Sequence, residues 1–182
     1  MFKLGNGMNE KTIEHFYSNS YVVENTSDTN RLKVSLSKSH IATLIQLLEK
    51  MDGPFFLLYI LHTPRTTAEA ARYQSAERSK EDAVLLLQEF EEYLENDGRH
   101  DLWLHAPKSN TTLVYDRHNL LFLYGLNTLQ TEYVQQICSP VEEINIPTPH
   151  KHFYHAKYDA AEEAILKHIS WRKSPLTEQD MQ

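Results

Sequence analysis

The chain has 182 residues and a mass of 21.3 kDa, enough for one compact domain but small for two. Its 25 acidic side chains outnumber its 18 basic ones, for a formal charge of -7 at pH 7, and no basic patch interrupts that excess. Because such a charge repels phosphate, we expect no nucleic-acid partner. No strong catalytic or metal-binding signature occurs, so the residues indicate fold and compartment more clearly than activity.

The composition also argues against membranes and export. The longest apolar run, Phe55–Leu61, is far shorter than the ~20 residues that span a bilayer. Gly5 and Gly7 interrupt the segment where a signal peptide has its apolar core. The only cysteine, Cys138, excludes an intrachain disulfide. We therefore expect a soluble protein in the cytoplasm, a reducing compartment, without a membrane partner.

The first third of the chain predicts a hairpin, a helix and a central strand. Residues 1–19 are weakly patterned and are expected to form a weakly ordered N-terminal segment. Tyr21–Glu24 and Leu32–Leu36 are rich in β-forming residues, with residues 25–30 as the loop between them. Apolar residues recur at helical spacing from Lys38 to Met51. Phe55–Leu61 is apolar throughout, as is typical of a strand buried on both faces.

The rest of the chain predicts a three-stranded meander between helices. We expect residues 63–79 to form a long loop. Ser79 has the position of an N-cap residue for a helix that we expect to reach Asn96. Residues 173–182 have the polar composition of a flexible tail. Between that helix and the tail, the predicted strands are Asp101–Ala106, Thr111–Asp116, Asn119–Tyr124 and Glu142–Ile146. The predicted helices in this part of the chain are residues 126–137 and Tyr158–Ile169.

This order of elements predicts one α+β domain over residues 20–172, a mixed sheet with helices mainly on one face and a ferredoxin-like flavour. Right-handed crossovers would make Phe55–Leu61 parallel to Asp101–Ala106, and Asn119–Tyr124 parallel to Glu142–Ile146. All four strands would then run the same way. Their carboxyl ends would share one edge of the sheet, where open sheets tend to bind ligands.

Several side chains with ligand-binding chemistry fall at that predicted edge. Arginine offers a planar fork of donors that suits a carboxylate or phosphate, and tyrosine adds a hydroxyl, so a small-anion pocket is one hypothesis. The alternative pairs Arg65 and Arg72 with Glu69 or Glu77 on a solvated loop. The predicted ligand-binding residues are His62, Arg65, Arg72, Tyr73, His105, His150 and His152.

The sharpest motif is the run His150, His152 and His155, which predicts a site for zinc or a similar transition metal. In an extended segment the first two imidazoles point to the same side, and His62 or His105 could supply another ligand. The spacing is weakly specific, because no acidic residue lies within the run. The alternative interpretation is a set of surface histidines in a proline-rich loop.

A second group of candidates falls at the opposite edge. Asp101 or Asp116 could orient His100 or His118 as a general base. The alternative interpretation of residues 116–119 is a tight turn, since Asp and Asn side chains bond to nearby backbone.

Two main functional hypotheses follow. The first is a binding domain without catalysis or cofactor, which engages a protein partner or a small anion. Trp103 and Tyr115 fall on the more polar face of their strands and could form an aromatic surface for that partner. The second is a histidine-rich, metal-assisted hydrolase with its site at the carboxyl edge. A self-associating homodimer is a third possibility.

Overall fold

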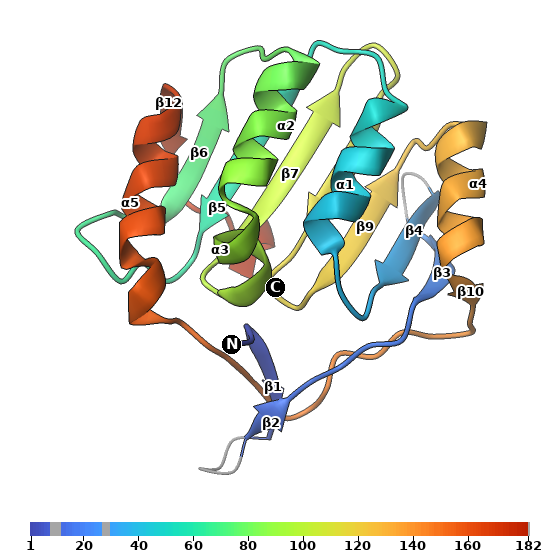
Figure 1. The fold of residues 1–182 in the computed structure, drawn as a ribbon, viewed down its shortest axis with the longest axis horizontal. Coiled ribbons are helices and arrows are strands. Elements are labelled where there is room, and N and C mark those ends of the chain that lie inside the picture. The colour runs from blue at the N-terminus through green and yellow to red at the C-terminus, as the bar shows by residue number, and fades with distance from the viewer. Residues whose placement is uncertain (8–11, 27–29, 182) are drawn as a thin grey trace.

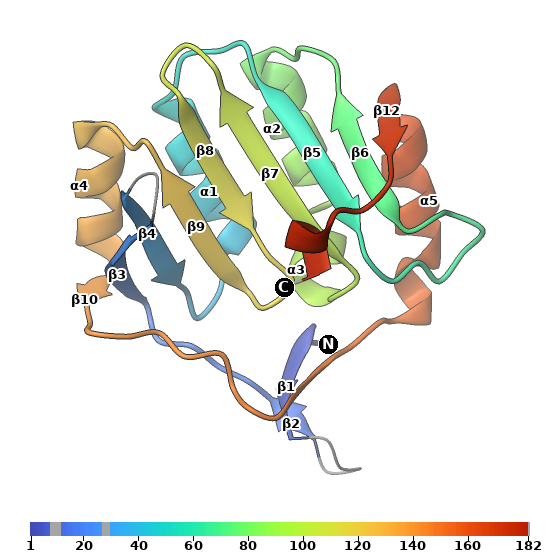
Figure 2. The same cartoon turned by 180° about the vertical axis from the view of Figure 1, so that it is seen from behind.

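The computed structural model describes residues 1–7, 12–26 and 30–181, and it confirms a single α+β fold. A nine-stranded sheet forms one layer, and helices cover one of its faces (Figure 1). Among the described residues the opposite face carries no α-helix, and the C-terminal segment, which ends in a short 3-10 turn, crosses it (Figure 2). No helix in the described ranges is long and apolar enough to cross a bilayer.

Groups of strands are separated by helices along the chain. The helices are α1 (His40–Glu49), α2 (Lys80–Glu89), α3 (Glu91–Asn96), α4 (Thr128–Ile137) and α5 (Asp159–His168), with short 3-10 turns η1 (Ala156–Tyr158) and η2 (Glu178–Met181). The strands are β1 (Leu4–Asn6), β2 (Ile13–Glu14), β3 (Ser20–Asn25), β4 (Asn30–Ser35), β5 (Phe56–Leu61), β6 (Ala71–Ser75), β7 (His100–Ala106), β8 (Thr111–Tyr115), β9 (Leu120–Tyr124), β10 (Ser139–Pro140), β11 (His150–His152) and β12 (Trp171–Ser174).

The large sheet has the order β10-β3-β4-β9-β8-β7-β5-β6-β12, and every pair is antiparallel except β10 with β3. The predicted hairpin is β3 and β4, which pair from Ser20↔Ser35 to Asn25↔Asn30. Within its predicted loop, residues 27–29 lie outside the described residues.

The predicted direction of the central strands is wrong, because β5 is antiparallel to β7. The cause is β6, which lies inside the segment that we expected to be a loop. β6 turns back against β5, and the helices α2 and α3 then connect β6 to β7 on the other side of β5. The helical crossover therefore connects β6 with β7, which are parallel to each other, and β5 is antiparallel to both.

Two further predicted elements differ from the structure. Residues 142–146 form no strand, and Glu142 and Glu143 are exposed in an irregular segment bounded by Pro140 and Pro147. Proline supplies no N–H to a sheet ladder, which opposes pairing there. The helix predicted to reach Asn96 is divided at Phe90 into α2 and α3.

Both terminal segments contact the rest of the chain. β12 pairs with β6 at one edge of the large sheet, and Asp180 in η2 accepts a hydrogen bond from Arg72 at 2.8 Å. Residues 8–11 lie outside the described residues, but β1 and β2 belong to a second, three-stranded sheet. The division into a domain of residues 20–172 and two mobile segments stays a prediction.

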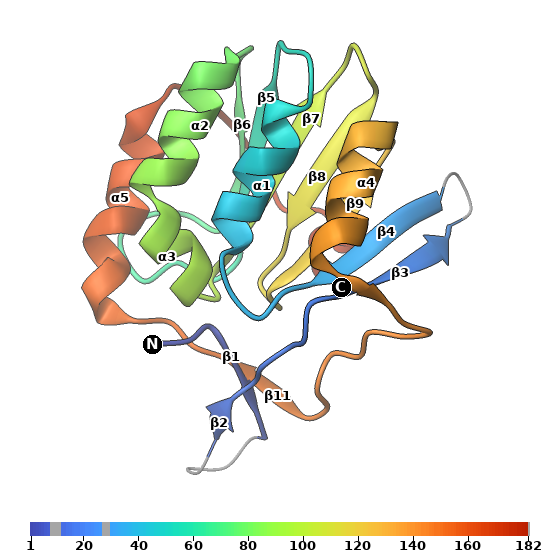
Figure 3. The same cartoon turned by 45° about the vertical axis from the view of Figure 1, so that its right-hand side comes forward.

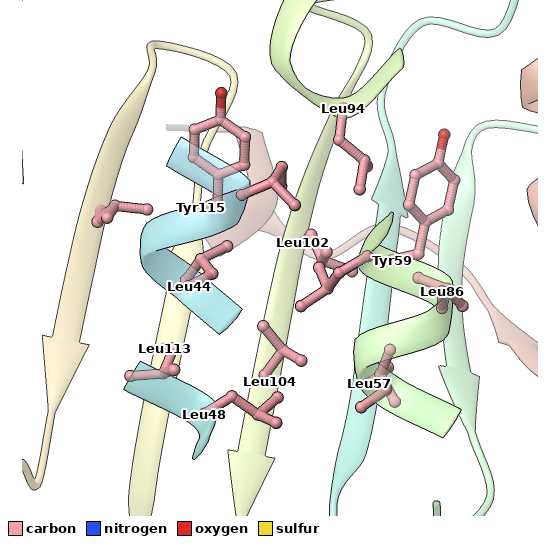
Figure 4. Close-up of a cluster of buried hydrophobic side chains, with 14 of the residues drawn as sticks. Leu44, Leu48, Leu57, Tyr59, Leu86, Leu94, Leu102, Leu104, Leu113 and Tyr115 are labelled. Atoms are coloured by element: carbon pink, nitrogen blue, oxygen red, sulfur yellow. The ribbon is translucent and has the colours of Figure 1, made fainter. Parts of the chain in front are cut away.

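The core lies between the large sheet and the helices (Figure 4). Leu44 and Leu48 of α1, Leu86 of α2, and Leu102 and Leu104 of β7 belong to one cluster, and all five side chains are at most 1% exposed. Burying one such leucine contributes about 1.5–3 kcal/mol relative to leaving it in water. This packing holds the strand ends in place, and with them the side chains described below.

The small sheet lies beneath one end of the large one (Figure 3). Its order is β11-β1-β2, with Leu4 opposite His152 and Asn6 opposite His150. Lys3 anchors it: the ammonium is buried, donates to the Leu94 carbonyl at 3.1 Å and lies 3.7 Å from the centroid of the Tyr115 ring. The small sheet therefore fixes β11 against the edge where β8 ends and β9 begins.

Candidate metal centre

A tight turn between β8 and β9 positions the first candidate ligand, His118. Asp116 Oδ1 accepts the backbone N–H groups of His118 at 2.9 Å and Leu120 at 2.8 Å, as expected of an aspartate that closes a turn. The other carboxylate oxygen, Oδ2, lies 2.8 Å from His118 Nδ1. Asn119 adopts the left-handed conformation with φ of 63°, which asparagine tolerates well. The predicted turn is thus also an oriented carboxylate–imidazole pair.

The other two candidate ligands, His150 and His152, come from β11. Alternation along the strand leaves Lys151 exposed and turns both imidazoles to the opposite side. The Nδ1 atom of His150 lies 2.9 Å from the Pro147 carbonyl oxygen.

The three rings form a compact group, with centroids 5.2 Å apart for His118 and His150, 4.8 Å for His118 and His152, and 5.2 Å for His150 and His152. One ring nitrogen from each lies within 4.8 Å of the others, and among the described residues this is the one group of metal-ligating side chains that is so close. Zinc at ~2.0–2.1 Å from each nitrogen needs nitrogen separations of roughly 3.4 Å, so the rings would move closer together around a bound ion.

Hydrogen bonds select the ring nitrogen that is available to an ion. A carboxylate and a carbonyl oxygen only accept hydrogen bonds, so His118 and His150 donate from Nδ1 and present the Nε2 lone pair. Metal-binding histidines are oriented in this way by second partners. His152 differs, since its Nδ1 is buried without a hydrogen-bond partner.

The surroundings favour the neutral form of His152 and the ionised form of Asp116. Burial, together with the charges of His118 and Arg117, lowers the pKa of His152 to about 3, so its ring is neutral at pH 7. Burial alone would raise the pKa of Asp116. The hydrogen bonds that it accepts from His118 and Leu120 nevertheless hold that pKa below its usual value. The orienting carboxylate is therefore ionised.

Gly98 permits the close approach of the chains around His152. A Cβ atom at position 98 would lie 2.8 Å from the Lys3 carbonyl oxygen and 3.1 Å from His152 Cβ. Backbone cannot move aside from such a contact as a flexible side chain can. Only glycine therefore fits where the small sheet meets the loop after α3.

Two of the three candidate ligands, His118 and His150, line a groove of about 530 Å³ on the sheet face opposite the α-helices. Asp101 lines the groove near the histidines; its Oδ1 accepts the Arg117 N–H at 2.7 Å, and its Oδ2 lies 2.7 Å from His62 Nε2. The predicted separation into two edges is wrong, because Asp101 and His118, expected at the edge opposite to His62 and His150, lie at the same edge as these histidines. Asp101 pairs with His62 and not with His100. His100 is instead buried between Tyr59 and Tyr93 on the helix side.

The structure brings together only some of the predicted ligand-binding residues. His62 lies at the same edge of the sheet as His150 and His152, because the carboxyl end of β5 is at that edge. His105 lies opposite Phe56 at the other end of β7, about 13 Å from Asp101 along the strand. Since β5 and β7 are antiparallel, the carboxyl ends of these two strands cannot share an edge.

The predicted third member of the histidine run, His155, is also outside the cluster. Its Nε2 lies 2.9 Å from the Phe2 carbonyl oxygen, and its backbone N–H donates to Asp97. The metal-ligand set that the geometry supports is therefore His118, His150 and His152.

The predicted anion-binding residues are not grouped. Arg72 and Tyr73 are consecutive in β6, so their side chains lie on opposite faces of the sheet. Arg72 is paired with Asp180 at 2.8 Å, and Arg65 with Asp159 at 3.0 Å. Neither arginine pairs with Glu69 or Glu77, which the alternative interpretation named. Both guanidinium groups are already engaged by carboxylates.

Scans of the chain against protein-family models, curated proteins and solved structures each found no match.

Proposed function

We propose that this chain is a metal-dependent hydrolase that binds zinc or a similar divalent transition metal through His118, His150 and His152. The observation that supports this most strongly is the convergence of the three imidazoles, two of them held by Asp116 and the Pro147 carbonyl. Catalytic zinc sites typically combine three protein ligands with one open position. The adjacent groove gives that position access to a substrate.

The bound ion would supply a water molecule with a pKa near 7 and would polarise the bond to be cleaved. Asp101 is the candidate proton acceptor, since it lines the same groove as His118 and His150. The Arg117 N–H and the His62 ring fix its two oxygens. General-base catalysis of this kind contributes about 10²–10⁴-fold in rate.

The test is hydrolysis of a panel of esters, amides and phosphate esters by protein stripped with a chelator and then titrated with Zn²⁺ or Mn²⁺. We expect activity to appear with one equivalent of metal. His118→Ala should lose both metal and activity, whereas Asp101→Asn should keep the metal and lose about 10²–10⁴-fold in rate. His105→Ala, at the far end of β7, is the matched control and should retain both.

Metal-independent hydrolysis, or no metal bound by the unaltered chain, would overturn the proposal. Stoichiometric metal without activity on any substrate would favour a metal-binding protein that is not an enzyme.

A binding domain without catalysis is the second candidate. The sheet face opposite the α-helices supports it (Figure 2), because Trp103 is half-buried and lines a pocket where it could contact a protein partner. A small-anion partner has less support, since the arginines expected to bind it are paired with carboxylates. For either function we propose a cytoplasmic location, because the single cysteine, Cys138, is a buried free thiol, which suits a reducing compartment.

A further inference from the structure

The groove beside the three histidines continues over an aromatic surface on the open face of the sheet. Trp103 of β7 lies opposite Val114 of β8, and Val114 lies opposite Phe122 of β9. Cross-strand partners share a face, so these three side chains form a row across the sheet. Trp103, Val114, Phe122 and the metal ligands His118 and His150 all line the same groove.

The spacing between this row and the candidate metal centre follows from the strands. Asp116, which orients His118, comes two residues after Val114, and two residues of a strand span roughly 7 Å. If a molecule binds the ion through one polar group, a ring attached to that group would therefore reach the aromatic row. The groove, at about 530 Å³, is within the usual range for a small-molecule site.

The charge at the far side of the row indicates what kind of group fits there. Arg31 lies 4.5 Å from the centroid of Phe122, but its guanidinium is already paired with Glu24 at 2.7 Å and donates to the Tyr124 hydroxyl at 2.7 Å. Glu24 is also paired with Lys33 at 3.6 Å, and the Lys33 ammonium lies 5.9 Å from the Phe122 centroid, so two cations share one carboxylate here. This end of the groove is therefore apolar and electropositive, and a flat aromatic group, whose electron-rich face attracts cations, fits it.

We propose that the substrate carries an aromatic ring that packs on Trp103 and Phe122 while its cleavable polar group meets the metal. This inference rests on the metal site of the proposed function and adds the substrate class. An aliphatic substrate of the same polar group would leave the aromatic row uncovered. The preference for the ring is thus a property of the groove, separate from the ability to bind metal.

The experiment compares two chelating probes, benzohydroxamate and acetohydroxamate, on the full chain loaded with cobalt(II). Both probes bind the ion through the same two oxygens, and only the first carries a ring. We expect both to change the cobalt absorption spectrum, with benzohydroxamate binding about tenfold more tightly, because ring packing adds this much to affinity. Trp103→Ala and Phe122→Ala should each reduce that preference to about twofold or less while cobalt content stays unchanged.

Phe16→Ala is the control, since Phe16 is an exposed aromatic residue on the N-terminal segment, 70% exposed and outside this groove. Equal affinity for the two probes on cobalt-loaded protein would overturn the inferred substrate class and leave the metal site intact. A preference for benzohydroxamate that remains in both Trp103→Ala and Phe122→Ala would also overturn the inferred substrate class. Failure of the unaltered chain to bind cobalt would overturn the proposed function itself.

Discussion

Buried, neutral histidines should make this protein sensitive to mild acid, and His40 is the clearest test. Its side chain is 6% exposed and stacks on the Tyr115 ring at 5.3 Å between centroids, and its Nε2 atom has no hydrogen-bond partner. Burial, with the charge of Lys3, lowers the pKa of His40 to about 3. His100, 1% exposed, has its pKa lowered for the same two reasons.

The sign and size of the effect follow from proton linkage. Between about pH 6.5 and pH 3 the unfolded chain binds a proton at His40 and the folded chain does not, so stability falls as the pH falls. From pH 7.5 to pH 5.0 the loss is about 2 kcal/mol for one such histidine whose unfolded pKa is ~6.5. His100 and His152, whose pKa values are also lowered, add to this loss, against a total stability of roughly 5–15 kcal/mol for a domain.

The assay is urea unfolding of the metal-free protein at pH 7.5 and at pH 5.0. The His40→Gln variant should lose about 2 kcal/mol less than the unaltered chain over this interval, whatever its stability at pH 7.5. His105→Gln, a half-buried histidine on the open sheet face, controls for the substitution itself. Unchanged stability between the two pH values, or the full pH dependence in His40→Gln, would refute the reasoning.

Three further predictions concern the metal site, a buried ion network and the thiol. Asp116→Asn, which removes the carboxylate that orients His118, should weaken zinc binding about 10–100-fold in a chelator competition assay; unchanged affinity would contradict the orienting role. Arg99→Met should destabilise the fold by about 3–5 kcal/mol in urea unfolding, because Asp97 and Glu162 would remain buried without their cation; a loss below about 1 kcal/mol would count against this. Burial raises the pKa of Cys138 to about 11, so a thiol reagent at pH 7 should modify Cys138 far more slowly in the folded chain than in the unfolded chain. Equal rates of modification in the two states would show the thiol to be accessible.

The sequence predicts the layered α+β architecture well, because its strongest patterns are physical requirements of that architecture. Two patterns indicate strands clearly: the apolar run at residues 55–61, and the alternation of Leu32, Val34 and Leu36 with polar residues. The strand that sets the direction of β5 is β6, whose residues 71–75 alternate buried and less buried positions. That alternation includes an arginine and a glutamine, and a five-residue pattern of this kind is weak beside a continuous apolar strand.

The candidate site is harder to predict, because contacts distant in sequence assemble it. His150 and His152 share a face of an extended segment, which local spacing indicates correctly. His118 comes from a turn about thirty residues earlier, and β1 is the element that holds β11 beside it. The pattern of residues 1–19 does not predict that strand. The one local signal for His118 is Asp116 two residues before it, a spacing that allows the carboxylate to orient the ring.

The most direct test of the three-histidine centre is the zinc K-edge X-ray absorption spectrum of the protein loaded with one equivalent of Zn²⁺. We expect three imidazole nitrogens at ~2.0–2.1 Å and one further light atom, with the number of imidazoles falling to two in His150→Ala. His155→Ala should leave the spectrum unchanged, because that ring lies outside the cluster. Zinc bound without imidazole scattering, or an identical spectrum from His150→Ala, would contradict the three-histidine centre.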